Sequence, residues 1–556
     1  MGMSARKTAL ITLAEELLMR LEIQEPDSFR LSAYRKLIET LSSLPEESFS
    51  SKDSLLSALK NKSGIGEKLL TIASQLYEKG QHPLLEQLRQ EVPDGVLELR
   101  RLPGLGPKRI HQLWKQVGVA SVDGLEQAFK RGKVHNLPGW GPALLRRLEE
   151  GIQFYRSQQG RMLYREALHL WKESIHPLEA EGLIPIPIGE LRRALPLLSP
   201  PLQGVLPASQ ETRFFQITKS SLQRRGSKWL ISPFVEIEFW PDEEMGIRLA
   251  TEGFPERVLQ ADNNPFRRLC EKEGSSCVGS SEKEIYNNKL GLPYIIPAWR
   301  DWEDVFLLAE KKLLPEPLSA HHVRGTVHVH TTYSDGVDSL EAMGEAARIK
   351  GWKWLGIADH SQRAAYARGL SPARLAEQAE AIDRLNEQYA GTFRLLKGVE
   401  ADILPDGRLD YDETVWKQMD FIVASIHEKL HMTAEEATAR LLRAIENPYV
   451  TILGHWTGRL LRSRPGYPID EERILRACAE RGVAIEFNAN PYRMEIDWKW
   501  VRRAAELGVS IILTTDAHSV EELDYWETGL AVLQKGLLPP SLLLNTSEEP
   551  PFPTKR

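Results

Sequence analysis

The stretch "RGTVHVHTTYSDG" at residues 324–336 places two histidines one position apart and an aspartate five positions later. A strand interior seldom contains a His-x-His pair, so we expect His328, His330 and Asp335 to bind something. The cluster begins past the middle of a 556-residue chain. A chain of this length exceeds a single hydrophobic core, and several domains are expected.

The composition changes from about residue 320 onwards. Most of the fourteen histidines lie beyond this point, and most of these stand at the ends of apolar, strand-like runs. The runs are 326–330, 354–360, 394–402, 420–427, 450–455, 483–490 and 509–518, with helical patterns between them such as 339–351, 433–447 and 497–508. This alternation predicts parallel strands in a closed or nearly closed α/β barrel. The C-terminal ends of all its strands would face one mouth, where active sites are built.

Histidines at the ends of successive strands would converge at that mouth together with aspartates and glutamates. One histidine at a strand end is more often structural, but a whole series accompanied by carboxylates favours metal ligands. Imidazole and carboxylate without thiolate suit Mn²⁺, Zn²⁺ or Fe²⁺.

These segments resemble the polymerase-and-histidinol-phosphatase (PHP) domain, in the version that is fused to bacterial family X DNA polymerases. The flanking stretches "GVEADILPDGRLDY" (398–411), "TGRLLRSRPGY" (457–467) and "FNANPYR" (487–493) resemble it as well. The resemblance implies a distorted (β/α)7 barrel that holds up to three divalent metals, with Mn²⁺ favoured and Zn²⁺ or Fe²⁺ as alternatives. It implies nine catalytic metal ligands: His328, His330, Asp335, His360, Glu400, His427, His455, Asp516 and His518.

The resemblance also implies a grouping of these ligands. By analogy, one metal takes His328, His330, Glu400 and Asp516, a second takes Asp335, His360 and His518, and a third takes His427 and His455 with Glu400 as a bridge.

Four residues near the ligands are candidates for supporting roles. Asp359 either orients a ligating imidazole or caps the following helix. Arg459, Arg462 and Arg464 are candidates to hold substrate phosphates, with plain surface charge as the alternative.

A repeat occupies the first third of the chain. "LPGLGP" at 102–107 recurs as "LPGWGP" at 137–142, and "SGIGEK" at 63–68 has the same Gly-x-Gly entry to a helical pattern. Pro107 and Pro142 suit the first position of a helix. The glycines permit a tight turn and leave backbone amides exposed to a phosphate oxygen.

These repeats resemble helix-hairpin-helix modules, which grip the DNA backbone; an array of purely structural αα-hairpins is the alternative. The residues expected to contact DNA are Gly64, Gly66, Lys68, Gly104, Gly106, Lys108, Arg109, Gly139 and Gly141. The segment 25–44 resembles the N-terminal, lyase-like domain of family X polymerases. In the family a Schiff-base lysine lies eight residues after the first glycine of the first hairpin, and here that position is Ile72, so lyase chemistry is not expected.

A palm domain should follow in a family X polymerase, but its metal carboxylates are missing. Between residues 160 and 250 the only aspartate is Asp242, and no Asp-x-Asp follows a Gly-Ser loop. Residues 214–241 predict a strand pair with Glu236 where the third carboxylate would fall, and 282–301 resembles the thumb. One carboxylate cannot organise two Mg²⁺ ions, so we expect no polymerase activity.

The sequence therefore predicts a multidomain protein. Its expected domains are an all-α lyase-like domain over 1–80, a fingers-like helix-hairpin-helix domain over 81–156, a degenerate α+β palm and thumb over 157–318, and the PHP barrel over 319–556.

Composition limits where such a protein works. No apolar run reaches the roughly 18 residues of a membrane helix, and the N-terminus reads as an amphipathic helix without a signal-peptide cleavage pattern. Three cysteines with no paired spacing indicate a reducing compartment. We expect a cytoplasmic, nucleoid-associated protein without a membrane partner.

The favoured function is a Mn²⁺-dependent 3′–5′ exonuclease in DNA repair, which acts on gapped, nicked or 3′-ended DNA. Cleavage at abasic sites and processing of blocked 3′ ends are possible further activities. The alternatives are an active family X polymerase with a PHP exonuclease, a small-molecule phosphatase of the histidinol-phosphatase type, and a DNA-binding scaffold whose metals only stabilise it.

Overall fold

A computed structural model describes residues 3–26, 30–60, 62–218, 222–254 and 281–552. Cys270 and Cys277 lie outside these residues. The chain forms two compact units, Met1–Gln159 with Arg462–Arg464, and Gly160–Leu461 with Pro465–Arg556. The four domain boundaries expected from the sequence remain predictions.

The first unit is helical, as the sequence predicts. Its helices are α1 (Met3–Gln24), α2 (Leu31–Ser43), α3 (Lys52–Lys60), α4 (Glu67–Lys79), α5 (Pro83–Glu91), α6 (Asp94–Glu98), α7 (Pro107–Gln112), α8 (Val122–Lys130) and α9 (Pro142–Gln158). Regularly spaced leucines such as Leu10, Leu17 and Leu37 turn one face of α1 and α2 inward. Two separate hydrophobic clusters result, one centred on residues 10–88 and the other on residues 92–152.

The second unit begins with a small mixed sheet. Its strands follow the order β2 (Ile186–Ile188), β4 (Leu202–Pro207), β7 (Val235–Trp240), β6 (Lys228–Ser232) and β5 (Gln223–Arg225). The helices here are α10 (Tyr164–Glu179), α11 (Gly189–Arg192), α12 (Glu211–Thr218), α13 (Met245–Thr251), α16 (Glu282–Glu284) and α17 (Val305–Glu310).

The strand pair expected within 214–241 is present as β6 and β7, which pair antiparallel. Its expected start is wrong, because residues 214–218 end helix α12. In that segment only Phe214 is fully buried, and a single buried aromatic side chain fits a helix face as well as a strand.

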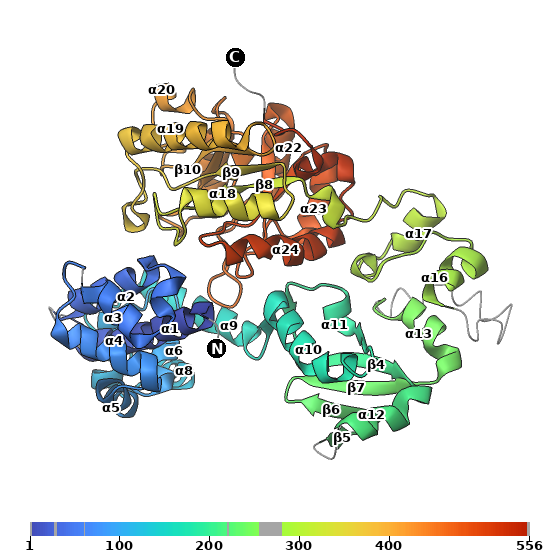
Figure 1. Cartoon of the computed structure of the whole chain (residues 1–556), viewed down its shortest axis with the longest axis horizontal. Coiled ribbons are helices and arrows are strands. Elements are labelled where there is room, and N and C mark those ends of the chain that lie inside the picture. The colour runs from blue at the N-terminus through green and yellow to red at the C-terminus, as the bar shows by residue number, and fades with distance from the viewer. Residues whose placement is uncertain (1–2, 27–29, 61, 219–221, 255–280, 553–556) are drawn as a thin grey trace. The chain divides into compact units, whose positions relative to one another are not determined.

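The seven apolar runs of the C-terminal part form seven parallel strands (Figure 1). They are β8 (Gly325–Val329), β9 (Trp354–Ile357), β10 (Arg394–Asp402), β11 (Phe421–Ser425), β12 (Ile452–Leu453), β13 (Ala484–Asn488) and β14 (Ile511–Thr514). Each pairs with its sequence neighbour. A bridge between Val329 and Ala517 joins the two ends of the sheet, and the backbone N–H of His330 donates to Ala517 O over 2.8 Å. The expected, nearly closed barrel is confirmed.

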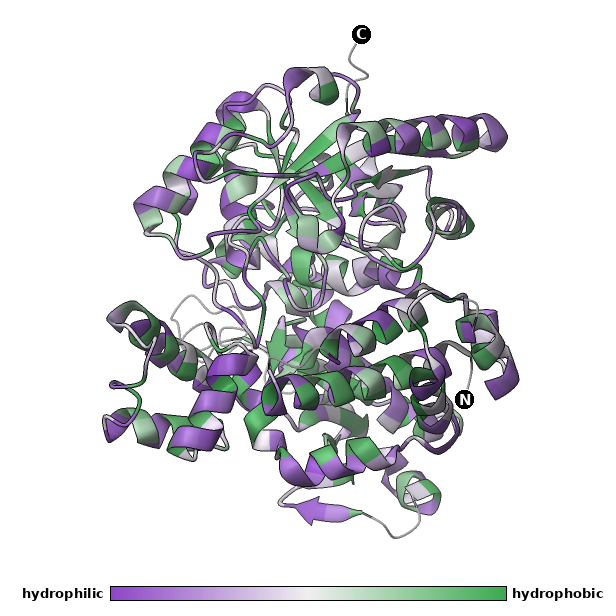
Figure 2. Ribbon diagram, turned by 90° about the vertical axis from the view of Figure 1, so that its left-hand side faces the viewer, coloured by the Kyte–Doolittle hydropathy of each residue, from purple (hydrophilic) through white to green (hydrophobic). Residues whose placement is uncertain are grey.

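Helices surround these strands (Figure 1). They are α18 (Leu340–Ile349), α19 (Pro372–Tyr389), α20 (Glu413–Trp416), α21 (Ala434–Ile445), α22 (Glu471–Arg481), α23 (Trp498–Glu506) and α24 (Tyr525–Leu533). The strands are largely hydrophobic and the helices carry polar outer faces (Figure 2), the pattern of parallel strands that are buried on both sides.

Side chains such as Phe421, Leu396 and Ile512 fill the interior of the barrel. A Cβ at Gly398 would lie 2.2 Å from Phe421 Cζ, so only glycine leaves room for that ring. None of the described helices is long and apolar enough to cross a bilayer.

A candidate metal centre at the mouth of the barrel

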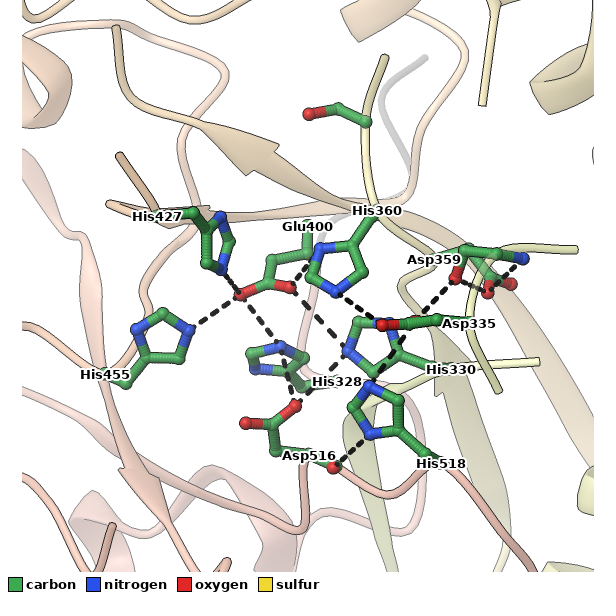
Figure 3. Close-up of polar contacts among 12 residues, drawn as sticks. His328, His330, Asp335, Asp359, His360, Glu400, His427, His455, Asp516 and His518 are labelled. Carbon is green, nitrogen blue, oxygen red and sulfur yellow. Dashed lines mark hydrogen bonds and ion pairs between the residues drawn. The ribbon is translucent and has the colours of Figure 1, made fainter. Parts of the chain in front are cut away.

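All nine expected ligand residues meet at the C-terminal end of the barrel strands (Figure 3). The strands deliver them in order, directly or through the loop that follows, as parallel strands in a barrel should. His328 and His330 come from β8 and its end, Glu400 from β10, and Asp516 and His518 from the segment after β14. His328, His330, Glu400 and His455 are almost completely buried.

The backbone is unusual at two of these ligands. His328 and Asp516 adopt left-handed conformations, with φ of 61° and 51°. The β8–β9 pairing also shifts register between Thr326 and Val329, on either side of His328. Such conformations cost of order 1–3 kcal/mol each and persist where a functional arrangement requires them.

Glu400 stands at the centre of the cluster. Its Oε1 lies 3.2 Å from His328 Nε2, 3.1 Å from His427 Nε2 and 2.9 Å from His455 Nε2, and its Oε2 lies 3.7 Å from His330 Nε2 and 2.9 Å from His360 Nδ1. One carboxylate therefore faces five imidazole rings.

The ligands fall into close groups whose donor atoms all lie within 4.8 Å of one another. The groups are His330, Asp335, His360 and His518; His328, His330 and Glu400; His328, His455 and Asp516; and His360, Glu400 and His427. The expected first and second groupings are largely reproduced. In the expected third grouping, His427 Nε2 and His455 Nε2 both lie against Glu400 Oε1, over 3.1 and 2.9 Å.

The donor atoms fit a metal cluster. Buried imidazole nitrogens of His328, His330, His360 and His455 have no hydrogen-bond partner among the described residues. Buried polar atoms are nearly always paired, so a row of unpaired nitrogens that faces carboxylates is suited to divalent cations.

Two carboxylates that the sequence analysis did not single out orient the ligand rings from behind. His328 Nδ1 hydrogen-bonds to Glu486, whose other oxygen accepts the backbone N–H of His455 over 2.6 Å. Asp402 lies 2.9 Å from His427 Nδ1. Such partners fix which ring nitrogen is left for a metal. Glu486 was detectable as the one charge inside the apolar run 483–490.

Asp359 plays neither of the roles proposed for it. Its buried carboxylate accepts the backbone N–H groups of Thr331 and Ser334 over 2.8 and 3.1 Å, the Thr331 hydroxyl over 2.6 Å and the Gln378 amide over 2.5 Å. It therefore fixes the loop that carries Asp335, and it touches neither an imidazole nor the start of a helix.

The electrostatics of the metal-free cluster are strongly coupled. Burial alone lowers the pKa of His427, but Glu400 and Asp402 raise it to about 10. Burial also lowers the pKa of His518, and the hydrogen bond with Asp335 and the Asp516 charge raise it to about 9. For Glu400 burial raises the pKa, yet the charged imidazoles hold it well below its usual value. Protons on His427 and His518 therefore balance the carboxylates until a metal replaces them.

Comparison with known proteins identifies the family. Residues 326–490 match the model of the PHP domain. The chain is 32% identical over 566 residues to the "DNA polymerase/3'-5' exonuclease PolX" of Bacillus subtilis, and the match covers 97% of both chains. The chain belongs to the PolX family. This PolX chain is a metal-dependent phosphoesterase, as its sequence predicts.

Other relatives match a smaller share of this PolX chain. A "Probable phosphatase" of Caldanaerobacter subterraneus is 35% identical over 163 residues, which cover 28% of this chain and 62% of that protein. Among solved structures, the histidinol phosphate phosphatase of Lactococcus lactis, complexed with zinc, L-histidinol and phosphate, is 17% identical. It covers 37% of this chain and 92% of its own, with a TM-score of 0.28.

The arginines after His455 have different surroundings in this PolX member. Arg459 donates to Arg493 O over 2.9 Å and to Asp497 over 2.8 Å, and it also bonds to Met494 O. Its guanidinium thus helps to hold the 493–497 segment, and its expected contact with a substrate phosphate stays a prediction. Arg462 and Arg464 are half-buried in the same loop, and their contact with substrate remains a prediction.

Arg493 is a functional candidate that the sequence analysis missed, although it ends the quoted "FNANPYR". Its Nε donates to Asp516 over 3.1 Å, and its buried Nη1 has no hydrogen-bond partner among the described residues. A cation beside a metal ligand with a spare donor is suited to a phosphate oxygen.

The mixed sheet β2–β4–β7–β6–β5, called the palm-like sheet below after the expectation for this region, contains no comparable group of metal donors among its described residues. β4 and β7 run parallel, with Gln203 opposite Glu236 and Val205 opposite Glu238. Glu236 is buried, and it accepts hydrogen bonds from Lys228 Nζ over 2.8 Å and from Gln203 Nε2 over 2.9 Å. Both bonds go to Oε1, so the Glu236 charge is paired with an ammonium group of the protein itself.

The Gly-x-Gly sites expected to contact DNA have the predicted local structure. Gly64, Gly104 and Gly139 have φ of 86°, 84° and 82°, which only glycine adopts readily. Gly66, Gly106 and Gly141 precede α4, α7 and α9, and Pro107 and Pro142 occupy the first helical positions as predicted. Nothing described lies within 4 Å of a Cβ at these three second glycines, so their backbone is open to approach. Arg109 donates to Gly104 O over 2.8 Å.

Proposed function

We propose that this protein is a Mn²⁺-dependent 3′–5′ exonuclease that acts on DNA ends in repair, with abasic-site and blocked 3′-end cleavage as related activities. The observation that carries the proposal is the convergence of nine imidazole and carboxylate ligands, several with unpaired buried nitrogens, in a chain related over its whole length to PolX. Zn²⁺ or Fe²⁺ would satisfy the same donors.

These nine residues would hold the metals, whose chemistry would be to activate water at neutral pH and to offset the charge of the phosphodiester. The side chains of the protein position the ligands and the substrate. Glu486 and Asp402 keep His328 and His427 in the ligating orientation, while Asp359 fixes the loop of Asp335. Arg493 offers its spare N–H to a non-bridging phosphate oxygen, where charge develops during attack.

DNA would be held by the hairpins that begin at Gly64, Gly104 and Gly139. Lys68 and Lys108 follow the exposed backbone amides of their hairpins by a few residues, where they can neutralise neighbouring phosphates. Such contacts do not read sequence, which suits an enzyme that must act on any strand end.

We further propose that the palm-like sheet does not polymerise. A nucleotidyl-transfer site needs several carboxylates free to bind two Mg²⁺ ions. Here Glu236 is neutralised by Lys228, and Gln203 and Val205 occupy the facing strand. An ammonium group thus already pairs with the one carboxylate that a metal ion would need.

The rival proposal is a small-molecule phosphatase, which is supported by the "Probable phosphatase" relatives of the barrel. One experiment separates the proposals: labelled gapped DNA is incubated with Mn²⁺, with and without dNTPs. We expect the primer to shorten under both conditions. Primer lengthening with dNTPs would contradict the inactive palm, and faster turnover of simple phosphomonoesters than of DNA would favour the phosphatase.

A further inference from the structure

One large aromatic ring is exposed beside the metal ligands. Tyr366 is 71% exposed, although its ring centroid lies 6.0 Å from the ring of His360 and 6.4 Å from that of His427. Single exposed aromatic side chains are common on protein surfaces. This one differs because it stands at the rim of the site, against two of the nine ligands.

The loop that carries Tyr366 is tightly held. Ala364 and Ala367, on either side of it, are each 1% exposed. The backbone N–H of Leu370 donates to His360 O over 2.8 Å, and that of Gly369 donates to Ala364 O over 3.0 Å. These bonds close the loop at its base, and the buried Ala364 and Ala367 anchor it while Tyr366 is exposed.

Further contacts fix the loop to the barrel. Arg363 pairs with Glu428 over 3.0 Å, and its backbone N–H donates to Asp410 over 3.0 Å. A Cβ at position 369 would lie 1.9 Å from Ser361 O, so Gly369 is required for the tight path. The exposed ring is therefore preorganised, which lowers the entropy lost when a ligand packs on it.

We propose that Tyr366 is a stacking platform for the nucleobase of the 3′-terminal nucleotide, whose phosphodiester reaches the metal centre. The inference rests on the proposed exonuclease function and adds the group that the site recognises. A fixed aromatic face next to a phosphoesterase centre suits a substrate that joins a phosphate to a flat, polarisable ring, and nucleobases of every sequence have such a face.

The platform would select for an unpaired, base-bearing end. A base that is still paired and stacked in a duplex is not free to lie on Tyr366, so fraying must precede cleavage. Substrates without a base would lack the stacking contribution, which corresponds to about a tenfold preference or more.

The test compares two single-stranded oligonucleotides of equal length, one with an ordinary 3′-terminal nucleotide and one with a 3′-terminal tetrahydrofuran abasic analogue. The readout is the ratio of kcat/KM for the two, measured with Mn²⁺ for the full-length protein, for Tyr366→Ala and for Tyr366→Phe. Phe234→Ala is the matched control, because Phe234 is also an exposed aromatic residue (42%) but lies in the β6–β7 turn of the palm-like sheet.

We expect Tyr366→Ala to lower the ratio about tenfold, while Tyr366→Phe and Phe234→Ala keep it within about twofold of the unmodified protein. An equal fall for both oligonucleotides in Tyr366→Ala would overturn the proposal and assign the ring to support of His360 and His427. An unchanged ratio would overturn it too. Failure of the proposed function differs from both, since the unmodified protein would then hydrolyse neither oligonucleotide.

Discussion

Two regions of this molecule carry a buried glutamate on a parallel strand, and they treat it in opposite ways. Glu236 on β7 of the palm-like sheet is satisfied by Lys228 and Gln203. Glu400 on β10 of the barrel faces five imidazoles, several of whose nitrogens have no hydrogen-bond partner in the described part of the chain.

The difference shows that the partners of a buried carboxylate indicate its role. A carboxylate that is paired with a lysine and an amide of its own protein has a structural role, and breaking that pair is expected to cost stability alone. A carboxylate among unpaired donors remains incomplete without a ligand. Both regions contain a buried glutamate. They differ in the groups that surround its carboxylate.

The largest effect is expected when ligands of the barrel are removed. If hydrolysis persisted without them, the contrast between the two glutamates would be wrong. His328→Ala combined with His330→Ala should lower Mn²⁺-dependent hydrolysis of a 3′-ended oligonucleotide by about a thousandfold or more, because two donors of adjoining metal groups disappear. DNA affinity, measured by fluorescence anisotropy, should change by no more than about twofold. Full activity in the double variant would refute the assignment of the site.

A second test uses the protons of the barrel cluster. His427 and His518 have pKa values of about 10 and about 9 in the metal-free protein, so both rings are charged at pH 7 and must release a proton to ligate a metal. Metal affinity should therefore rise between pH 6 and 9, by up to about tenfold per pH unit for each proton released, and level off above pH 10. Calorimetric titration with Mn²⁺ in buffers of different ionisation enthalpy counts the released protons.

The same protonation should affect the stability of the metal-free protein. The folded pKa of each ring lies above the ordinary value near 6.5. Their contribution is fully present below pH 6.5 and is lost as the pH rises through about 9 and 10. Chelated protein should therefore become less thermally stable over that window, and a pH-independent melting temperature would contradict these charge states.

The sequence predicted the barrel and its ligand list because both depend on local pattern. Apolar runs of strand length set β8 to β14, and parallel strands deliver their final residues to one mouth whatever the loops do. The length of each strand was predicted less accurately, since the run 450–455 forms a strand only over Ile452–Leu453. The helical end of α12 was missed because a short segment with few buried side chains has no decisive period.

The spacing of the ligands in the sequence does not encode their division between metals, because that division depends on ring orientation. The rings of His427 and His455 both turn Nε2 toward Glu400 Oε1, over 3.1 and 2.9 Å, as the family resemblance implied. Asp359 accepts from residues 331–334, which lie 25–28 positions earlier in the chain, so sequence proximity to His360 was misleading. Arg493 lies in the quoted stretch 487–493, but nothing else in the sequence indicated a functional role for it.

Arg493 supplies the third test, since it is a buried cation whose Nε contacts the ligand Asp516 over 3.1 Å. Arg493→Ala should lower kcat for DNA about a hundredfold through loss of charge stabilisation at the phosphate, and Arg493→Lys should recover part of it. Arg473→Ala is the control, because Arg473 pairs with Glu435 on the outer helices. Equal activity of Arg493→Ala and the control would exclude Arg493 from the reaction.

A fourth test separates DNA holding from hydrolysis. Lys68→Ala combined with Lys108→Ala should weaken DNA binding about tenfold at moderate salt and flatten its salt dependence by about 0.9 in log–log slope for each duplex phosphate that the protein no longer neutralises. Single-turnover hydrolysis at saturating protein should be preserved. Lys52→Ala is the control, because Lys52 pairs with Glu78 over 3.0 Å. An unchanged salt slope would favour the purely structural αα-hairpins.

The smallest effect is expected in the palm-like sheet, and it completes the comparison. Lys228→Met leaves the buried Glu236 with only Gln203 as partner, so the free energy of unfolding should fall by about 1–3 kcal/mol. Adding Glu236→Leu should restore much of that stability, because two apolar side chains can replace a buried pair almost neutrally. Denaturant unfolding measures both values. Exonuclease activity should stay at the level of the unmodified protein throughout; a large loss with folded protein would mean that Glu236 belongs to the chemistry after all, and the contrast between the two glutamates would fail.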